Sequence, residues 1–130
     1  MLFRVTGAVL GLQLLLGGLL TFGFISAEAH IVAGFLLLIL AVATMAVWLT
    51  TRPPFRPMQV LTSVIVVLIL LQIILGFATL DTGSQTIAFI HFANALAIFG
   101  AMMAGTFMAL RWDRMASGDP ASGKDERSTS

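Results

Sequence analysis

Two short patterns in this 130-residue chain contain the side chains best suited to chemistry. Each pattern joins a glutamine, a glycine four residues later and a histidine further along the chain: Gln13, Gly17 and His30, then Gln72, Gly76 and His91. His30 and His91 are the only histidines in the sequence. Because imidazole is the commonest side-chain ligand of metals, these two residues are the first candidates for a functional site.

The two patterns recur at a period of about 60 residues, which indicates duplication of one supersecondary unit. The long apolar stretches around them make that unit a helical hairpin. Two stacked hairpins form a four-helix bundle. A bundle with one inward imidazole on each of two equivalent helices is suited to holding a flat metal cofactor, above all haem, from both faces.

The composition defines the class of protein. Hydrophobic residues make up 58% of the chain and charged residues 10%, with no cysteine, whereas a soluble domain is roughly 25% charged. Four stretches without Asp, Glu, Lys or Arg approach the about 20 residues that cross the hydrocarbon core. We therefore predict an all-α membrane protein, a four-helix transmembrane bundle of two repeated hairpins in residues 1–115, with helices at about 5–25, 30–50, 58–79 and 86–110. Residues 116–130 are predicted to form a disordered cytoplasmic tail.

The basic residues predict an orientation. All seven fall on one side if the amino terminus is cytoplasmic, as the positive-inside rule requires. The other side then receives only Glu28 and Asp81 as formal charges. We expect a multi-pass protein of a plasma or inner membrane, with both termini cytoplasmic and no nucleic-acid partner. A cleaved signal peptide ending near Ala27-Glu-Ala29 is the alternative for the first helix, but the length of its apolar run favours retention.

Both histidines are predicted to lie at one depth. His30 precedes Arg52 by 22 residues and His91 precedes Arg111 by 20, so at about 1.5 Å per residue both lie roughly 30 Å from the inner rim, close to the outer face. One turn inward, Gly34 and Ala95 leave room for a macrocycle against the helix. Gln13 and Gln72 are predicted to hydrogen-bond across the bundle or to orient a bound ligand.

Two other interpretations of the histidines stay open. Each could simply hydrogen-bond a neighbouring group, and Glu28 is close to His30 in the sequence. Alternatively, His30 and His91 could bind Zn or Cu together with Glu28 or Asp81, although this spacing matches no recognised metal-binding signature.

The Gln-x-x-x-Gly pattern in the first and third helices, with a histidine near the outer start of the second and fourth, resembles one half of haem A synthase. That family consists of two four-helix halves, and the resemblance covers residues of about 5–112. It implies that His30 and His91 are axial ligands of a haem. The stretches Ala29-His30-Ile-Val-Ala-Gly34 and His91-Phe-Ala-Asn94-Ala95 also resemble a family of small four-helix membrane proteins of unassigned function.

The sequence departs from the catalytic half of that enzyme family. That half carries acidic residues a turn from its first histidine and an arginine directly after it, whereas here Glu28 is two residues before His30 and Ile31 follows it. The departure favours a haem-binding or electron-transfer protein over a stand-alone enzyme.

The leading hypothesis is a small membrane protein with one bis-histidine haem b near the outer face. Its role would be electron transfer or haem handling with a redox or membrane-complex partner, because one haem near one face cannot carry electrons across the bilayer. The alternatives are a half-size haem A synthase-like enzyme acting as a homodimer, and a cofactor-free accessory subunit of a membrane complex.

Overall fold

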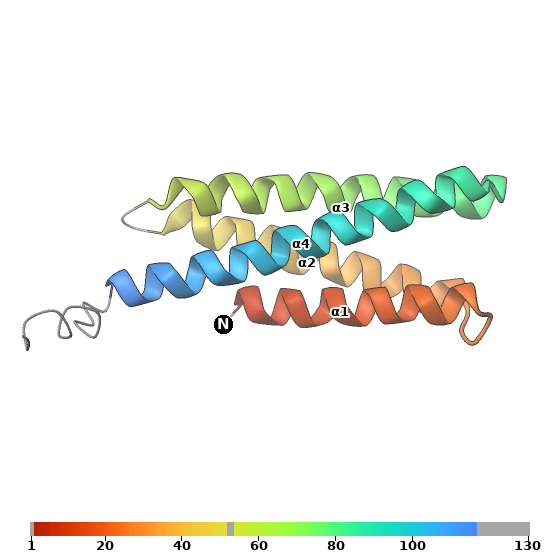
Figure 1. Ribbon diagram of the computed structural model, residues 1–130, viewed down its shortest axis with the longest axis horizontal. Helices are drawn as coiled ribbons and strands as arrows, with labels where there is room; N and C mark the ends of the chain where they lie inside the picture. The colour runs from red at the N-terminus through yellow and green to blue at the C-terminus, as the bar shows by residue number, and fades with distance from the viewer. Residues whose placement is uncertain (1, 52–53, 117–130) are drawn as a thin grey trace, which may run out of the picture.

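Four helices in antiparallel succession form an elongated bundle (Figure 1). The computed structural model describes residues 2–51 and 54–116. The helices are α1 (Leu2–Thr21), α2 (Ala27–Thr50), α3 (Arg56–Thr82) and α4 (Gln85–Ala116). The all-α, four-helix prediction is confirmed. The predicted tail lies outside the described residues, apart from Ala116, which belongs to α4.

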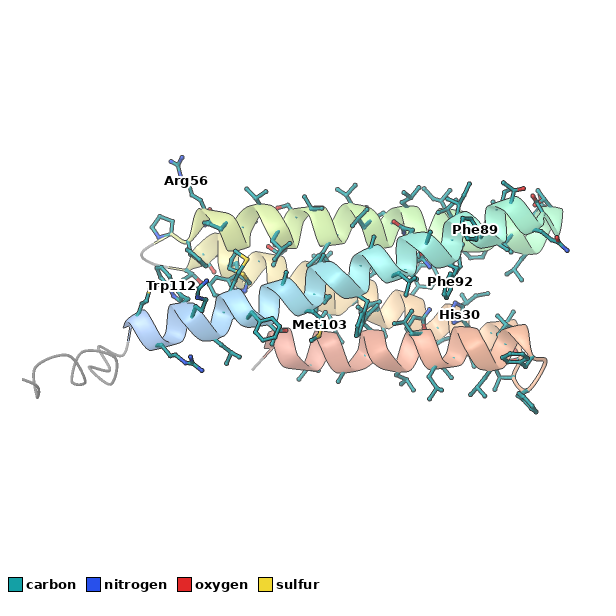
Figure 2. All side chains as sticks on the ribbon, in the orientation of Figure 1. His30, Arg56, Phe89, Phe92, Met103 and Trp112 are labelled. Carbon is teal, nitrogen blue, oxygen red and sulfur yellow. The ribbon has the colours of Figure 1, made fainter. Side chains whose placement is uncertain are left out.

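Three helices have the length and composition needed to cross a membrane: α2, α3 and the Gln85–Trp112 part of α4. The described apolar segment of α1, Val5–Leu20, is shorter. Large apolar side chains cover the outside of the bundle (Figure 2); Val32 is 69% exposed and Phe89 is 70% exposed. A monomeric soluble protein rarely exposes so much contiguous apolar surface. The exterior therefore suits lipid, and the chain has the character of a membrane protein.

The end of α1 differs from the prediction. The sequence predicted a helix to residue 25, but α1 ends at Thr21 because Gly23 adopts a left-handed conformation with φ of 74°. The Phe24 N–H donates to the Leu19 carbonyl at 2.9 Å and the Gly23 N–H donates to the Leu20 carbonyl at 3.0 Å. This is a Schellman motif, which satisfies the last helical carbonyls and turns the chain toward α2.

The remaining helix ends follow local chemistry. Pro57 occupies the first turn of α3, where its missing N–H is not needed. Gly83, with φ of 61°, ends α3 and donates its N–H to the Thr79 carbonyl. The helices run somewhat longer than predicted: α2 begins at Ala27 rather than near 30, and α4 continues to Ala116 rather than ending near 110.

The buried core occupies the middle of the bundle. It contains one set of tightly packed side chains: Leu10, Leu37, Ala41, Met58, Ile65, Ile69, Ile98 and Met102. A hydroxyl–hydroxyl bond of 2.9 Å between Thr6 and Thr44 joins α1 to α2 within the buried region. We call the end with the α1–α2 and α3–α4 links the paired-link end (Figure 1). The core fills the bundle on one side of the histidines and leaves the region around them less densely packed.

Candidate functional site

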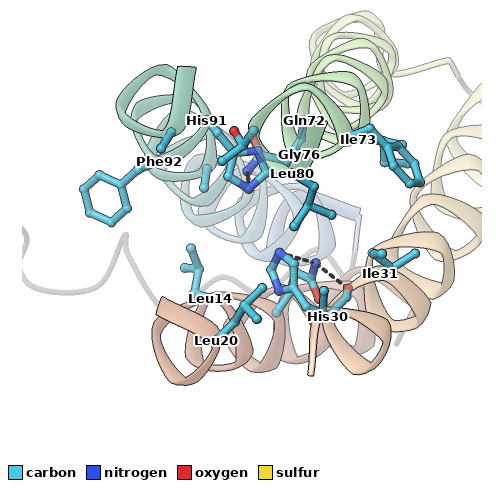
Figure 3. A pocket seen from close by; sticks show the side chains of 18 of the residues that line it. Leu14, Leu20, His30, Ile31, Gln72, Ile73, Gly76, Leu80, His91 and Phe92 are labelled. Carbon is cyan, nitrogen blue, oxygen red and sulfur yellow. Dashed lines mark hydrogen bonds between the residues drawn. The ribbon is translucent and has the colours of Figure 1, made fainter. Parts of the chain in front are cut away.

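The two histidines meet inside the bundle near the paired-link end. His30 comes from α2 and His91 from α4, and their ring centres are 6.3 Å apart with the ring planes at 66° (Figure 3). The distances to the arginines predicted that both histidines lie at one depth in the bundle, and in the structure the two rings do lie close together. His30 and His91 are far apart in the sequence, so only the packing of the two hairpins brings their rings together.

A chain of hydrogen bonds orients His91. Asn94 Nδ2 donates to the Leu68 backbone carbonyl at 3.0 Å and to Gln72 Oε1 at 2.7 Å. Gln72 Nε2 in turn contacts His91 Nε2 at 3.1 Å. Because a backbone carbonyl can only accept, the Leu68 contact determines the direction of every later bond in the chain. His91 Nε2 is therefore the acceptor, and the proton of the neutral ring is on Nδ1.

Gln13 plays the corresponding part at His30. Its Nε2 donates to the backbone carbonyl of His30 at 3.0 Å and lies 3.4 Å from the ring Nε2 (Figure 3). The carbonyl again makes the amide nitrogen the donor, so His30 Nε2 is an acceptor as well. Gln13 Oε1 is buried and has no hydrogen-bond partner within the described part of the chain.

Glycines let the neighbouring helices approach both rings. A Cβ added at Gly17 would lie 3.2 Å from Cε1 of His30, and one added at Gly76 would lie 3.2 Å from Cε1 of His91. The edge of each imidazole thus rests against the backbone of the preceding helix. Gly34 touches the site differently, because a Cβ there would lie 3.1 Å from Gln13 Nε2.

A cavity of about 580 Å³ surrounds the rings and receives side chains from all four helices. This volume is within the range of roughly 300–1,000 Å³ that small-molecule and cofactor sites occupy. Its lining is largely apolar, with polar side chains that include the two glutamines and Thr79. The arrangement is that of a ligand site with a few placed polar groups in an apolar enclosure.

All six residues proposed from the sequence line this one cavity: His30, His91, Gly34, Ala95, Gln13 and Gln72. The contacts of Gly34 and the glutamines are more specific than the sequence indicated, since Gly34 is in contact with an amide that itself contacts an imidazole. Ala95 is 9% exposed and contributes to the wall.

The sequence reasoning assigned no role to Asn94. It follows His91 by three residues, a spacing that places two side chains on the same helix face. The sequence signal that could have identified Asn94 is a polar amide inside an apolar helix, one turn from a histidine. The sequence placed Gly17 and Gly76 in a pattern with each histidine, but it did not indicate that these glycines lie against the imidazoles.

The carboxylates do not join the histidines. Glu28 and Asp81 are absent from the lining of the cavity. Among residues 2–51 and 54–116, no three His, Cys, Asp or Glu side chains gather in a way that could hold a metal ion. A Zn or Cu site with a carboxylate as third ligand therefore gains no support from the arrangement.

Comparison of the chain with models of protein families, with curated proteins and with solved structures found no match in any of the three. The function must therefore be inferred from the cavity and its two histidines.

Proposed function

We propose that this protein is an integral membrane protein that binds one haem b between His30 and His91, for electron transfer or haem handling. The observation that carries the proposal is the distance of 6.3 Å between the two ring centres. A metal bonded to one nitrogen of each ring at about 2 Å places the ring centres about 6 Å apart. The spacing of the rings thus suits a single metal ion between them.

The hydrogen bonds keep both imidazoles in the form that a metal requires. A metal takes the lone pair of a neutral imidazole, and the amides of Gln13 and Gln72 contact that lone pair on each Nε2. The Nδ1 atoms are buried and lack a hydrogen-bond partner among the described residues. We infer that Nε2 of each ring would hold the iron and that each glutamine amide then gives up this contact.

The shape of the cavity supports a flat cofactor. Its volume of about 580 Å³ and its apolar wall suit a macrocycle, and Gly17, Gly34 and Gly76 remove side chains from the space around the rings. When bound, haem supplies one-electron redox chemistry at a potential that burial and hydrogen bonds adjust. If His30 and His91 both held the iron, they would favour electron transfer over oxygen chemistry.

A reduced-minus-oxidised spectrum of the purified protein tests this proposal. After expression with ample haem and gentle solubilisation, we expect a low-spin b-type spectrum and one haem per chain. The matched control is the double variant His30→Ala/His91→Ala from membranes prepared in the same way, which should be colourless. A colourless wild-type protein would exclude haem binding and favour the accessory-subunit alternative. Conversion of added haem O to haem A would instead identify the half-size enzyme.

We also infer that the α1–α2 and α3–α4 hairpins are copies of one unit. In both, a glutamine amide contacts a histidine Nε2, and a glycine lies against Cε1 of the same ring. A Cβ added to that glycine would lie 3.2 Å from Cε1 in each copy. Sequence duplication accounts for the same local geometry arising twice, and it implies that α1 is retained and spans the membrane as α3 does.

The proposed orientation places both termini in the cytoplasm. Arg56 and Trp112 lie at the end of the bundle opposite to His30 (Figure 2). Trp112 and Phe55 stack there with ring centres 4.5 Å apart. Basic residues favour the cytoplasmic side, and tryptophan favours either membrane–water interface, so the histidines would lie toward the outer face.

Reporter fusions test the orientation. A fusion at Ser117 should report a cytoplasmic location, and an insertion in the turn at Asp81–Ser84 should report the opposite side. Because the two sites lie at opposite ends of α4, each is the control for the other. An external signal from Ser117 would overturn the assignment.

A further inference from the structure

We propose that the two histidines are unequal ligands: His91 is fixed, whereas His30 is exchangeable and gives way to a small diatomic ligand. This inference rests on the proposed haem. The new site would be the iron position that His30 vacates, with the Gln13 amide beside it. Carbon monoxide bound to ferrous haem represents the class of ligand.

The first argument is the difference between the two hydrogen-bond networks. The chain from the Leu68 carbonyl through Asn94 and Gln72 to His91 connects α3 with α4, and its amide groups support one another. At His30 the residue equivalent to Asn94 is Ala33, which has no amide to offer. The amide contacts to both rings would be given up when Nε2 holds the iron, but the two bonds of Asn94 do not involve the ring and would remain. These two bonds hold the turn after His91 to α3, whereas the bond from Gln13 Nε2 to the backbone carbonyl holds His30, so His91 is held more firmly.

The second argument is the position of each histidine in its helix. His30 is the fourth residue of α2, within the first turn, where backbone N–H groups lack intrahelical acceptors. The side chain of the N-cap residue Ser26 makes no capping hydrogen bond. His91 is the seventh residue of α4, where Ser84 Oγ accepts from the Ile87 N–H at 3.5 Å. A helical side chain lies over the turn that precedes it, and no complete turn of α2 precedes His30, so its side chain rotates more easily than that of His91.

The third argument concerns what remains when His30 moves. Gln13 Nε2 is anchored by the His30 backbone carbonyl at 3.0 Å, not by the ring alone. Rotation of the side chain moves the imidazole and leaves that carbonyl in place. Gln13 Nε2 lies 3.4 Å from His30 Nε2, so its second amide hydrogen would then lie beside the vacated position. It can donate a hydrogen bond to the outer atom of a bound diatomic molecule.

The infrared spectrum of carbon monoxide bound to the ferrous protein tests this proposal in a protein that keeps both His30 and His91. A hydrogen bond to the bound molecule lowers its C–O stretching frequency. We expect carbon monoxide to displace the low-spin spectrum, and Gln13→Leu to raise the stretching frequency while the control variant Leu12→Ala, at an exposed position of the same helix outside the cavity lining, leaves it unchanged. No shift in Gln13→Leu, an equal shift in Leu12→Ala, or no binding of carbon monoxide to a haem-loaded protein would overturn the proposal.

A second measurement compares retention of haem. His30→Ala should keep a high-spin haem during gel filtration, whereas His91→Ala should lose it. Asn94→Ala should weaken haem binding about 10–100-fold, the usual effect of removing a group that orients a metal ligand. Equal loss from His30→Ala and His91→Ala would refute the inequality and leave haem binding itself established. A colourless wild type would instead refute the proposed function and this inference together.

Discussion

Replacing either His30 or His91 with alanine should abolish the low-spin haem spectrum. Removal of one axial ligand turns a six-coordinate iron into a five-coordinate or water-ligated one, and no change in packing imitates that spectral change. The expectation follows from the approach of the two rings to 6.3 Å from separate helices. Optical spectra of the oxidised and reduced variants, recorded at equal protein concentration, measure the effect.

Two outward-facing residues supply controls for the histidine variants. Val32 is two residues after His30 and 69% exposed, and Phe89 is two residues before His91 and 70% exposed. Val32→Ala and Phe89→Ala alter the same helices on the face away from the cavity and should leave the spectrum unchanged. Membrane fractionation should show that all four variants insert. A single histidine variant that keeps the wild-type low-spin bands would exclude that residue as a ligand.

Gly34→Leu should lower haem occupancy while both ligands remain. Gly34 lines the cavity, and even a Cβ at this position would lie 3.1 Å from Gln13 Nε2. A leucine must therefore displace the amide and fill part of the cavity. Overpacking of this kind costs about 1–3 kcal/mol, which corresponds to a roughly 5- to 150-fold fall in haem affinity. Haem titration of the apoprotein measures the change.

Gly11→Leu is the matched control, because Gly11 is an exposed helical glycine with no heavy atom within 4 Å of an added Cβ. It does not line the cavity. This variant should bind haem as the wild type does. If Gly34→Leu also titrates like the wild type, the cavity beside Gln13 is not where the macrocycle lies.

The sequence by itself determined the four helices and the common level of the two histidines. The apolar runs separated by Arg52–Pro57 and Asp81–Ser84 could be interpreted directly, because partition into lipid depends on composition along the chain. The similar distances of His30 and His91 from basic residues, 22 and 20 residues, predicted their common level, since helical rise is constant. Residue types and their spacing along the helices then identified six residues that line the cavity.

The sequence placed the end of α1 too late, at residue 25, for a local reason. Phe22, Phe24 and Ile25 continue the apolar run beyond Thr21, so hydropathy does not mark the end of the helix. The left-handed φ of Gly23 ends it, and the resulting link places Ala27 at the start of α2. Glycines are common within apolar helices, so the presence of Gly23 in the sequence does not show that the helix ends there. Its left-handed conformation is seen only in the folded chain.

Only the tertiary structure decided which atoms meet. The helices are apolar on nearly all sides, so no polar face in the sequence sets their rotation about their own axes. Packing at Gly17 and Gly76 sets that rotation by letting backbone approach the imidazoles. It thereby directs Gln72 toward both His91 and Asn94. A rotation of a helix by the angle between two successive residues would break the hydrogen bonds between helices. Hydropathy contains no information about this rotation.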